Sequence, residues 1–319
     1  MQTGRFPTAA AFALAASTLA TGCYSSMKFT EDRVYELDAP TELAVELKTR
    51  HGAVDVAPHG VPMPEWAERE LGSTEPDPDR VLVLARLRTS KEHRLQEVVL
   101  EPEIELGTLH LEAEWPDKGR DGVGYVVRVP SRITAAQIRT GHGPVDLWSV
   151  DGPANVYTGH GGIELYEIAG EVEARSGHGG IYAEHLAGDA MLKTGHGTIS
   201  ATDVSGVLTA RTGHGPIDVE DPGSTVLLRT GHGSIRFVGD DDHGSIDANT
   251  GHGNIELVTD SHLIGELTGR TGYGRVRFEM PNGNRIDSRR SATIQLDGPE
   301  SASLTTGHGV ISVRVRDGG

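Results

Sequence analysis

A four-residue phrase, Thr-Gly-His-Gly, recurs along this chain at a fixed interval. Its histidine occupies six positions spaced 18 residues apart, with serine replacing the threonine in the third copy: His142, His160, His178, His196, His214 and His232. Further copies lie at His252 and His308, and Tyr273 takes the histidine position of another. A short fixed period is typical of repeat proteins, in which each unit stacks on its neighbour and none folds alone.

Apolar residues alternate with polar ones on both sides of this histidine. Three and five residues after it the side chains are apolar, as at Ile199 and Ala201. Four and six residues before it they are apolar again, as at Leu192 and Ala190. A period of two predicts short strands with one inward face, and the threonine shares the inward parity. Glycines about ten residues after the histidine, such as Gly188, indicate a second corner, where tight backbone angles favour glycine.

Two strands and two corners in each 18-residue coil predict an all-β fold, a single-stranded β-solenoid whose coils stack about 4.8 Å apart. Right-handed winding is expected, because parallel crossovers are nearly always right-handed. We expect the repeats to occupy residues 131–319, each coil stacking on the one before, with the less regular segment 283–316 closing the far end. An aromatic content of 5% suits the narrow core of such a solenoid.

The first 22 residues are typical of a signal peptide. Arg5 precedes an apolar stretch, residues 6–19, that is too short for an ordinary membrane-spanning helix. Small residues then precede Cys23, which is the only cysteine of the chain. This order predicts a lipoprotein that is cleaved before Cys23 and lipidated there; an ordinary secretory signal is the alternative. Tyr24 replaces the aspartate that favours inner-membrane retention, so we expect the outer membrane, at its periplasmic face or the cell surface.

The charge of the chain limits its partners. Removing residues 1–22, which contain one arginine and no acidic residue, changes the formal net charge from −17 to −18. Such a chain repels nucleic acid and bare anionic membrane. We therefore expect attachment to the cell envelope through the lipid alone, and partners that are glycans or envelope proteins. The sequence leaves the oligomeric state open.

The residues before the repeats predict a β-rich N-terminal cap over 33–130, preceded by a tether over 23–32. A degenerate copy of the phrase surrounds His51, and alternating apolar segments predict further strands up to Val129. Residues 57–79 are rich in proline and acidic residues and are expected to form an exposed insertion with a short helix over 64–71. A cap of this kind covers the open edge of a solenoid, which would otherwise recruit other chains.

This order of segments resembles the bacterial putative-adhesin family of β-strand repeats, which is related to the head GIN domain and whose function is otherwise unknown. The resemblance rests on the signal segment, the early phrase at His51, a strand block ending in Val127-Arg128-Val129-Pro130, and the serial repeats. It covers about residues 33–316 and implies a β-solenoid with a binding role. The family repeat is similar to Thr-Gly-Ser-Gly-Asp-Ile, so the resemblance does not explain the histidines.

Stacking places one histidine on each coil beside a mainly basic position three residues earlier. The candidate ligand-binding residues are therefore these two rows: His142, His160, His178, His196, His214, His232 and His252, with Arg139, Arg175, Arg211 and Arg229. Lys193 and Arg270 extend the basic row, and Tyr157 interrupts it.

Several interpretations of these rows remain open. The imidazoles could be turn residues that stack and bond to the backbone. They could bind zinc, copper or nickel, with His160, His178, His196 and His214 as the candidate ligands. The rows could also grip a phosphorylated or sulfated glycan, or a protein partner. Calcium is disfavoured, because each coil carries a single glycine phrase rather than the two of calcium-binding repeats. The acidic run 240–242 is expected to be a solvated loop.

Catalysis finds little support in the sequence. No nucleophile elbow or recurring triad is present. A glycan-active enzyme could use Asp146, Glu164 and Asp218, but Tyr182 and Ser200 interrupt that row. The sequence therefore predicts a non-enzymatic binding or structural module, with a metal-binding surface protein and a glycan-active enzyme as alternatives.

Overall fold

The computed structural model describes residues 27–71, 77–116, 119, 121–239 and 243–317. The chain divides into two compact units, unit 1 ending at Asp151 and unit 2 beginning at Gly152. Strands make up 65% of the described residues and helices 4%, in long sheets of mainly parallel strands, which confirms the all-β solenoid. Its handedness stays a prediction. The predicted signal peptide, Cys23 and the acidic run 240–242 lie outside the described residues.

Unit 1 is built from two sheets and two short helices. One sheet has the order β1-β4-β8-β3-β10, and the other the order β9-β2-β7-β5, with β6 also pairing with β7. The elements of this unit are β1 (Phe29–Asp38), β2 (Ala44–His51), β3 (Val54–Pro58), α1 (Glu65–Leu71), β4 (Arg80–Thr89), α2 (Arg94–Glu97), β5 (Val99–Leu100), β6 (Glu103–Glu105), β7 (Thr108–Glu114), β8 (Gly122–Val129), β9 (Ala135–His142) and β10 (Val145–Val150).

Two sequence predictions for this region need correction. Strand β1 begins at Phe29 and pairs antiparallel with β4 over its whole length, so residues 29–32 belong to a strand and not to a tether. The insertion at 57–79 is also not simply exposed, because Ala67 of α1 is fully buried. It packs with Leu82, Leu84 and Val126 in a small apolar cluster on one face of the sheet. Burying that helix face holds α1 against the sheet.

A buried ion pair fastens the segment before α1 to the same sheet face. The Arg128 guanidinium, which is inaccessible to solvent, donates to both carboxylate oxygens of Asp55 at 2.7 and 3.0 Å. It also donates to the carbonyl oxygens of Val61, at 3.4 Å, and Pro62, at 2.9 Å. A buried charge is tolerated when it is paired and hydrogen-bonded in this way. Arg128 therefore positions α1 through the loop that leads into it.

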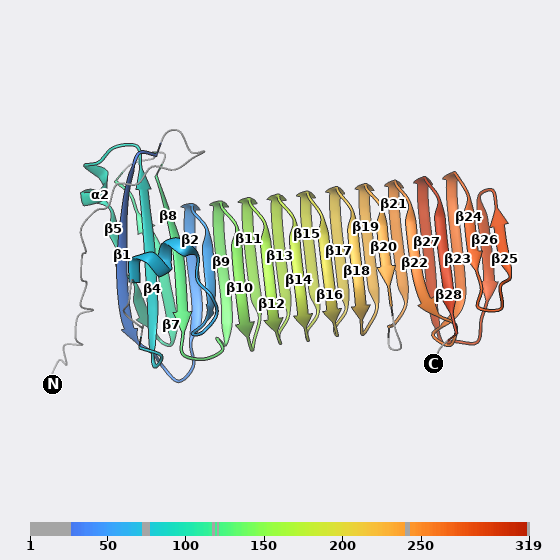
Figure 1. The fold of residues 1–319 in the computed structure, drawn as a ribbon, viewed down its shortest axis with the longest axis horizontal. Helices are drawn as coiled ribbons and strands as arrows, with labels where there is room; N and C mark the ends of the chain where they lie inside the picture. The colour runs from blue at the N-terminus through green and yellow to red at the C-terminus, as the bar shows by residue number, and fades with distance from the viewer. Residues whose placement is uncertain (1–26, 72–76, 117–118, 120, 240–242, 318–319) are drawn as a thin grey trace. The chain divides into compact units, whose positions relative to one another are not determined.

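Unit 2 is a stack of coils in which each coil adds one strand to each of two sheets (Figure 1). Its elements are β11 (Ala154–His160), β12 (Ile163–Ile168), β13 (Val172–His178), β14 (Ile181–Leu186), β15 (Ala190–His196), β16 (Ile199–Val204), β17 (Leu208–His214), β18 (Ile217–Pro222), β19 (Val226–His232), β20 (Ile235–Val238), β21 (Ile246–His252), β22 (Ile255–Asp260), β23 (Ile264–Tyr273), β24 (Val276–Glu279), β25 (Arg285–Ser288), β26 (Ser291–Gln295), β27 (Glu300–His308) and β28 (Ile311–Arg316). Neighbouring 18-residue coils pair in register, so that equivalent residues are direct partners.

The inward pattern extends one position further than the sequence predicts. Residues three and five after the histidine are buried as expected, and so is the residue eight after it, as at Leu186 and Val204. The residue before each of these has a left-handed backbone, with φ of 56° at His185 and 53° at Asp203. This kink inserts one residue into the alternation and returns the next side chain to the core. The strand ends one residue after this kink, and the bend that leads to the next strand lies at the glycine near position ten, as the sequence predicts and as Gly188 and Gly206 show.

The corner glycine is required for a different reason. A Cβ placed on Gly188 would lie 2.4 Å from the carbonyl oxygen of Gly170 in the neighbouring coil. A Cβ on Gly206 would lie equally close to Gly188. Close approach of stacked backbones, and not backbone angle, excludes side chains at this position.

The last coil does not stack in sequence order. Strands β27 and β28 lie between the coil β21–β22 and the coil β23–β24, because β27 pairs in parallel with both β21 and β23. Strand β28 likewise pairs with both β22 and β24 (Figure 1). The antiparallel strands β25 and β26 form the outer layer on β24 and β23. Residues 283–316 are expected to close the end of the solenoid, but only β25 and β26 do so. The C-terminal coil, β27 and β28, lies further in, between the coils β21–β22 and β23–β24.

No helix among the described residues is long and apolar enough to span a bilayer.

Deleting residues 300–319 should release more than the strands it removes. Strands β23 and β24 contact the rest of unit 2 through β27 and β28, so amide-exchange protection should be lost over 264–295 and kept over 154–232. A chain that ends at Arg316 keeps both strands and is the control. Protection that persists over 264–279 in the deletion would contradict this account, because it would mean that those strands can dock directly on β21 and β22.

Acidification should destabilise the fold through His243. Its ring is buried, contacts the carbonyl oxygen of Gly244 and the hydroxyl of Thr259 at 2.9 and 2.6 Å, and packs edge-on against Phe237. Burial lowers the pKa of His243 below its ordinary value. The unfolded chain therefore takes up the proton first as pH falls through about 6.5, and the free energy of unfolding decreases.

Denaturant unfolding at about pH 7.5 and about pH 5.5 measures this effect. His243→Gln should lose less stability between the two pH values than the unmodified chain does. His93→Gln, at an exposed position of unit 1, is the control. An equal loss in the His243→Gln variant and the unmodified chain would contradict the assignment.

Candidate functional site

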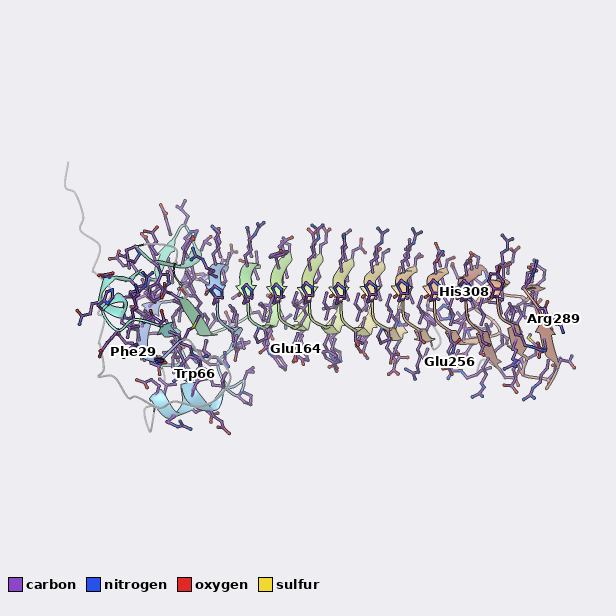
Figure 2. The ribbon with its side chains drawn as sticks, turned by 90° about the horizontal axis from the view of Figure 1, so that it is seen from above. Phe29, Trp66, Glu164, Glu256, Arg289 and His308 are labelled. Atoms are coloured by element: carbon purple, nitrogen blue, oxygen red, sulfur yellow. The ribbon has the colours of Figure 1, made fainter. Side chains whose placement is uncertain are left out.

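The exposed histidines at the glycine corners of unit 2 form one continuous column, which we call the histidine column: His160, His178, His196, His214, His232, His252 and His308. Successive ring centroids lie 4.7–4.9 Å apart and the ring planes are within 5° of parallel. Tyr273 extends the column beyond His308 at 4.8 Å. Figure 2 shows the row of rings running along unit 2 towards His308. Insertion of the C-terminal coil keeps the column unbroken.

The residues flanking each histidine explain why the rings stack. A Cβ on Gly195 or Gly197 would lie 2.5 or 2.3 Å from a carbonyl oxygen of the neighbouring coil, and Gly197 also has φ of 152°. Only glycine permits both the approach and the angle. The Thr194 hydroxyl donates to the carbonyl oxygen of Gly179 at 2.8 Å, and the same bond recurs in other coils. Each bond stabilises the corner by about 1 kcal/mol.

A row of cations lies three residues before the column, on the same strands. Arg175, Lys193, Arg211 and Arg229 are direct partners on neighbouring strands, and all four are exposed. Arg175 pairs with Glu173 and Arg229 with Asp247 (3.4 Å). We call this row and the histidine column together the His–Arg edge. It contains six of the seven histidines and three of the four arginines that the sequence singles out.

The remaining two predicted residues, His142 and Arg139, belong to unit 1. His142 stacks on His51 with a centroid distance of 4.7 Å and an angle of 17°. The Nδ1 atom of His51 lies 3.1 Å from the carbonyl oxygen of Asp121. Burial lowers the pKa of His51. Arg139 is exposed, and its backbone partner on the neighbouring strand β2 is Lys48.

The spacing of the column does not suit a shared metal ion. Because the rings are nearly parallel, equivalent nitrogens of neighbours are separated by the same 4.7–4.9 Å as their centroids. Two zinc–nitrogen bonds of about 2.1 Å span at most about 4.2 Å, so the rings would have to leave the stack. In the part of the chain that the structure describes, no cluster of three or more His, Cys, Asp or Glu side chains could hold an ion.

The acidic residues considered for catalysis are not brought together. Glu164 and Asp218 lie on strands three steps apart, about 14 Å at the usual strand spacing. Glycosidases need carboxylates about 5–9.5 Å apart. Asp218 is instead paired with Arg236 at 2.8 Å, and Glu164 accepts from the Tyr166 hydroxyl at 2.9 Å. Asp146 belongs to unit 1.

Unit 1 contains a cavity of about 220 Å³ that the sequence analysis does not predict. Its lining includes the ring of Trp66, two arginines of β4, the two carboxylates Asp55 and Asp146, and the stacked pair His51 and His142. The signal in the sequence is the alternation Gly122-Val123-Gly124 in a strand, which removes two consecutive side chains from one sheet face. The proline-rich segment that supplies the opposite wall shows no helix periodicity long enough to reveal that it covers this face.

No family model matches the chain, and no curated protein matches it. A solved structure of a putative cell adhesion protein from Clostridium sporogenes aligns over 90% of this chain and 99% of its own, with 9% identity and a TM-score of 0.26. A putative adhesin from Bacteroides fragilis aligns over 91% and 98%, with 11% identity and a TM-score of 0.36. At these values neither match bears on function.

Replacing Gly197 by alanine should destabilise unit 2 by roughly 2 kcal/mol or more, because both its φ and the nearby Gly179 carbonyl oxygen exclude a Cβ. Gly162→Ala, two residues after His160, is the matched control, since its Cβ would lie 3.7 Å from the nearest atom. It should change stability by less than about 1 kcal/mol. Chemical denaturation of both variants measures the difference, and equal effects would contradict the role assigned to close backbone approach.

Proposed function

We propose that this chain is a non-enzymatic binding module of the cell envelope that holds an extended anionic glycan along the His–Arg edge. The observation that carries the proposal is the repetition of one exposed imidazole and one exposed cation on consecutive coils, 4.7–4.9 Å apart. Such a surface offers the same pair of groups many times in a straight line. A polymer with regularly spaced phosphate or sulfate groups can match it over several coils, which gives avidity without a deep pocket.

The chemistry of the edge favours anions over neutral partners. Lys193 and Arg211 lie in the middle of the cation row, where guanidinium and ammonium groups donate charge-assisted hydrogen bonds to phosphate or sulfate oxygens. The exposed imidazoles beside them add further donors. The rest of the chain is strongly acidic, which confines attraction of a polyanion to this edge and suppresses binding elsewhere.

Placement at the envelope completes the proposal. Lipidation of Cys23 after removal of residues 1–22 would anchor the chain to the outer membrane, with only a short segment before β1. A chain anchored in this way would face either the periplasm or the cell exterior. We therefore assign the chain an adhesion or envelope-organising role and no catalytic one.

Binding of heparin, a sulfated glycan, to residues 24–319 tests the proposal, with neutral dextran as the comparison. Heparin should bind and should dissociate as ionic strength rises, because screening weakens the ionic contacts. The Lys193→Ala/Arg211→Ala variant should bind at least about tenfold more weakly, which corresponds to about 1.4 kcal/mol.

The matched control removes two cations from the other sheet, in the variant Arg236→Ala/Arg277→Ala. Both arginines are paired with carboxylates there. Each of the two double variants removes two positive charges, so their net charges are equal, but this one leaves the His–Arg edge intact. It should bind heparin within about twofold of the unmodified chain. Equal weakening in both double variants would show that only net charge matters and would contradict the proposed edge.

A further inference from the structure

The cavity of unit 1 lies on the face of the sheet that α1 covers. Its floor is the backbone of β8, where Gly122 and Gly124 replace two consecutive side chains on this face. The partners of these glycines on β4 are Arg88 and Arg86, which stand beside the floor. The next residue of β8 on the same face, Val126, is covered by α1. A Cβ on Gly122 would lie 2.1 Å from the carbonyl oxygen of His51, so His51 occupies that position, whereas the nearest atom to a Cβ on Gly124 lies at 3.3 Å. The hollow therefore exists mainly because Gly124 leaves a side chain out of an otherwise covered sheet face.

The wall formed by Trp66 is fixed before any ligand arrives. The guanidinium of Arg86 covers one face of the indole ring, 4.2 Å from its centre, and donates to both carboxylate oxygens of Asp32 at 2.7 and 2.5 Å. A ligand ring can therefore stack only on the opposite face of the indole. The helix that carries Trp66 is held by its apolar cluster. Figure 2 labels Trp66 beside the main body of unit 1. Preorganised aromatic walls lower the entropic cost of binding.

The polar groups of the cavity balance in charge. Two arginines, Arg86 and Arg88, face two carboxylates, Asp55 and Asp146. Asp55 is already neutralised by the buried Arg128, and Arg86 by Asp32. A charged ligand would therefore add an uncompensated charge, whereas a neutral ligand rich in hydroxyl groups would not. Carboxylates accept hydrogen bonds from hydroxyl groups, and guanidinium groups donate hydrogen bonds to hydroxyl oxygens. A sugar hydroxyl could therefore act as either donor or acceptor in this cavity.

We propose that this cavity binds one neutral sugar residue, with the apolar face of the sugar ring against Trp66 and its hydroxyls on the arginines and carboxylates. The volume of about 220 Å³ equals roughly seven waters at about 30 Å³ each, which suits a single ring and not an oligosaccharide. An apolar wall with a few convergent polar groups is the usual composition of a small-ligand site. This site is separate from the His–Arg edge and differs from it in ligand charge.

Saturation-transfer NMR on residues 24–319 tests the proposal with the methyl glycosides of glucose, galactose, mannose and N-acetylglucosamine, and with glucuronic acid as the acidic comparison. At least one neutral glycoside should receive saturation. Gly124→Leu should abolish the signal, because the new side chain starts from the cavity floor, where its Cβ would lie 3.3 Å from the carbonyl oxygen and 3.6 Å from the amide nitrogen of Ala53. Trp66→Ala should weaken binding at least about tenfold.

Two controls establish that the sugar signal comes from this cavity. Tyr273→Ala removes an aromatic side chain that is 73% exposed in unit 2, and Lys193→Ala/Arg211→Ala removes the edge cations; neither should change the signal. Thermal unfolding establishes whether each variant is folded. If Gly124→Leu does not fold, the effect of Trp66→Ala on sugar binding tests the proposal. Three results would each overturn the proposal: no transfer to any neutral glycoside, transfer to glucuronic acid alone, or an unchanged signal in the folded cavity variants.

Discussion

The close approach of stacked backbones at the histidine corner is the constraint on which unit 2 depends. A carbonyl oxygen of one coil occupies the position that a Cβ of the next coil would take, as Gly179 and Gly197 illustrate. Glycine on both sides of the histidine is therefore obligatory, and the threonine hydroxyl two residues earlier ties the same corner to its neighbour. With its flanks fixed, the histidine side chain can only project outward, and identical coils place identical rings in register. The column is thus a consequence of the fold before it is a site.

That origin also limits what the column can do. Rings that repeat at the strand spacing are too far apart for equivalent nitrogens to share an ion, but they present a regular series of donors to an extended partner. The cation row has the same origin, since Lys193 and Arg211 lie side by side only because the coils that carry them stack in register. A polymer with regularly spaced charged groups can match a regularly spaced row of donors, so this spacing is the property on which the proposed function rests. The cavity of unit 1 depends on the opposite circumstance, the absence of a side chain at Gly124 on a covered sheet face.

Much of the fold could be predicted from the sequence, because the period of 18 and the alternation around Ile199 and Leu192 together specify stacked coils of short strands. The threonine and glycine positions were equally informative. The kink at His185 and Asp203 has only a weak signal in the sequence, since histidine and aspartate are enriched at left-handed angles but the same position is glutamate at 167 and serine at 149. The inserted C-terminal coil was missed because pairing of β27 with both β21 and β23 is a long-range choice between similar strands. The cavity was missed for a related reason, as it joins segments between Trp66 and Asp146 that no local pattern connects.

The order of the coils can be measured directly with pairs of cysteines in residues 24–319, which contain no other cysteine. One chain carries His252→Cys and His308→Cys, and the other carries His252→Cys and Tyr273→Cys. Dibromobimane, a short bifunctional thiol reagent, reports only pairs that lie close together. If the C-terminal coil lies between the coils that carry His252 and Tyr273, the first pair should be linked rapidly, because its residues are direct partners on neighbouring strands. The second pair should not be linked, because the C-terminal coil separates its residues. Linking of the second pair in preference to the first would contradict the stacking on which the histidine column and the His–Arg edge depend.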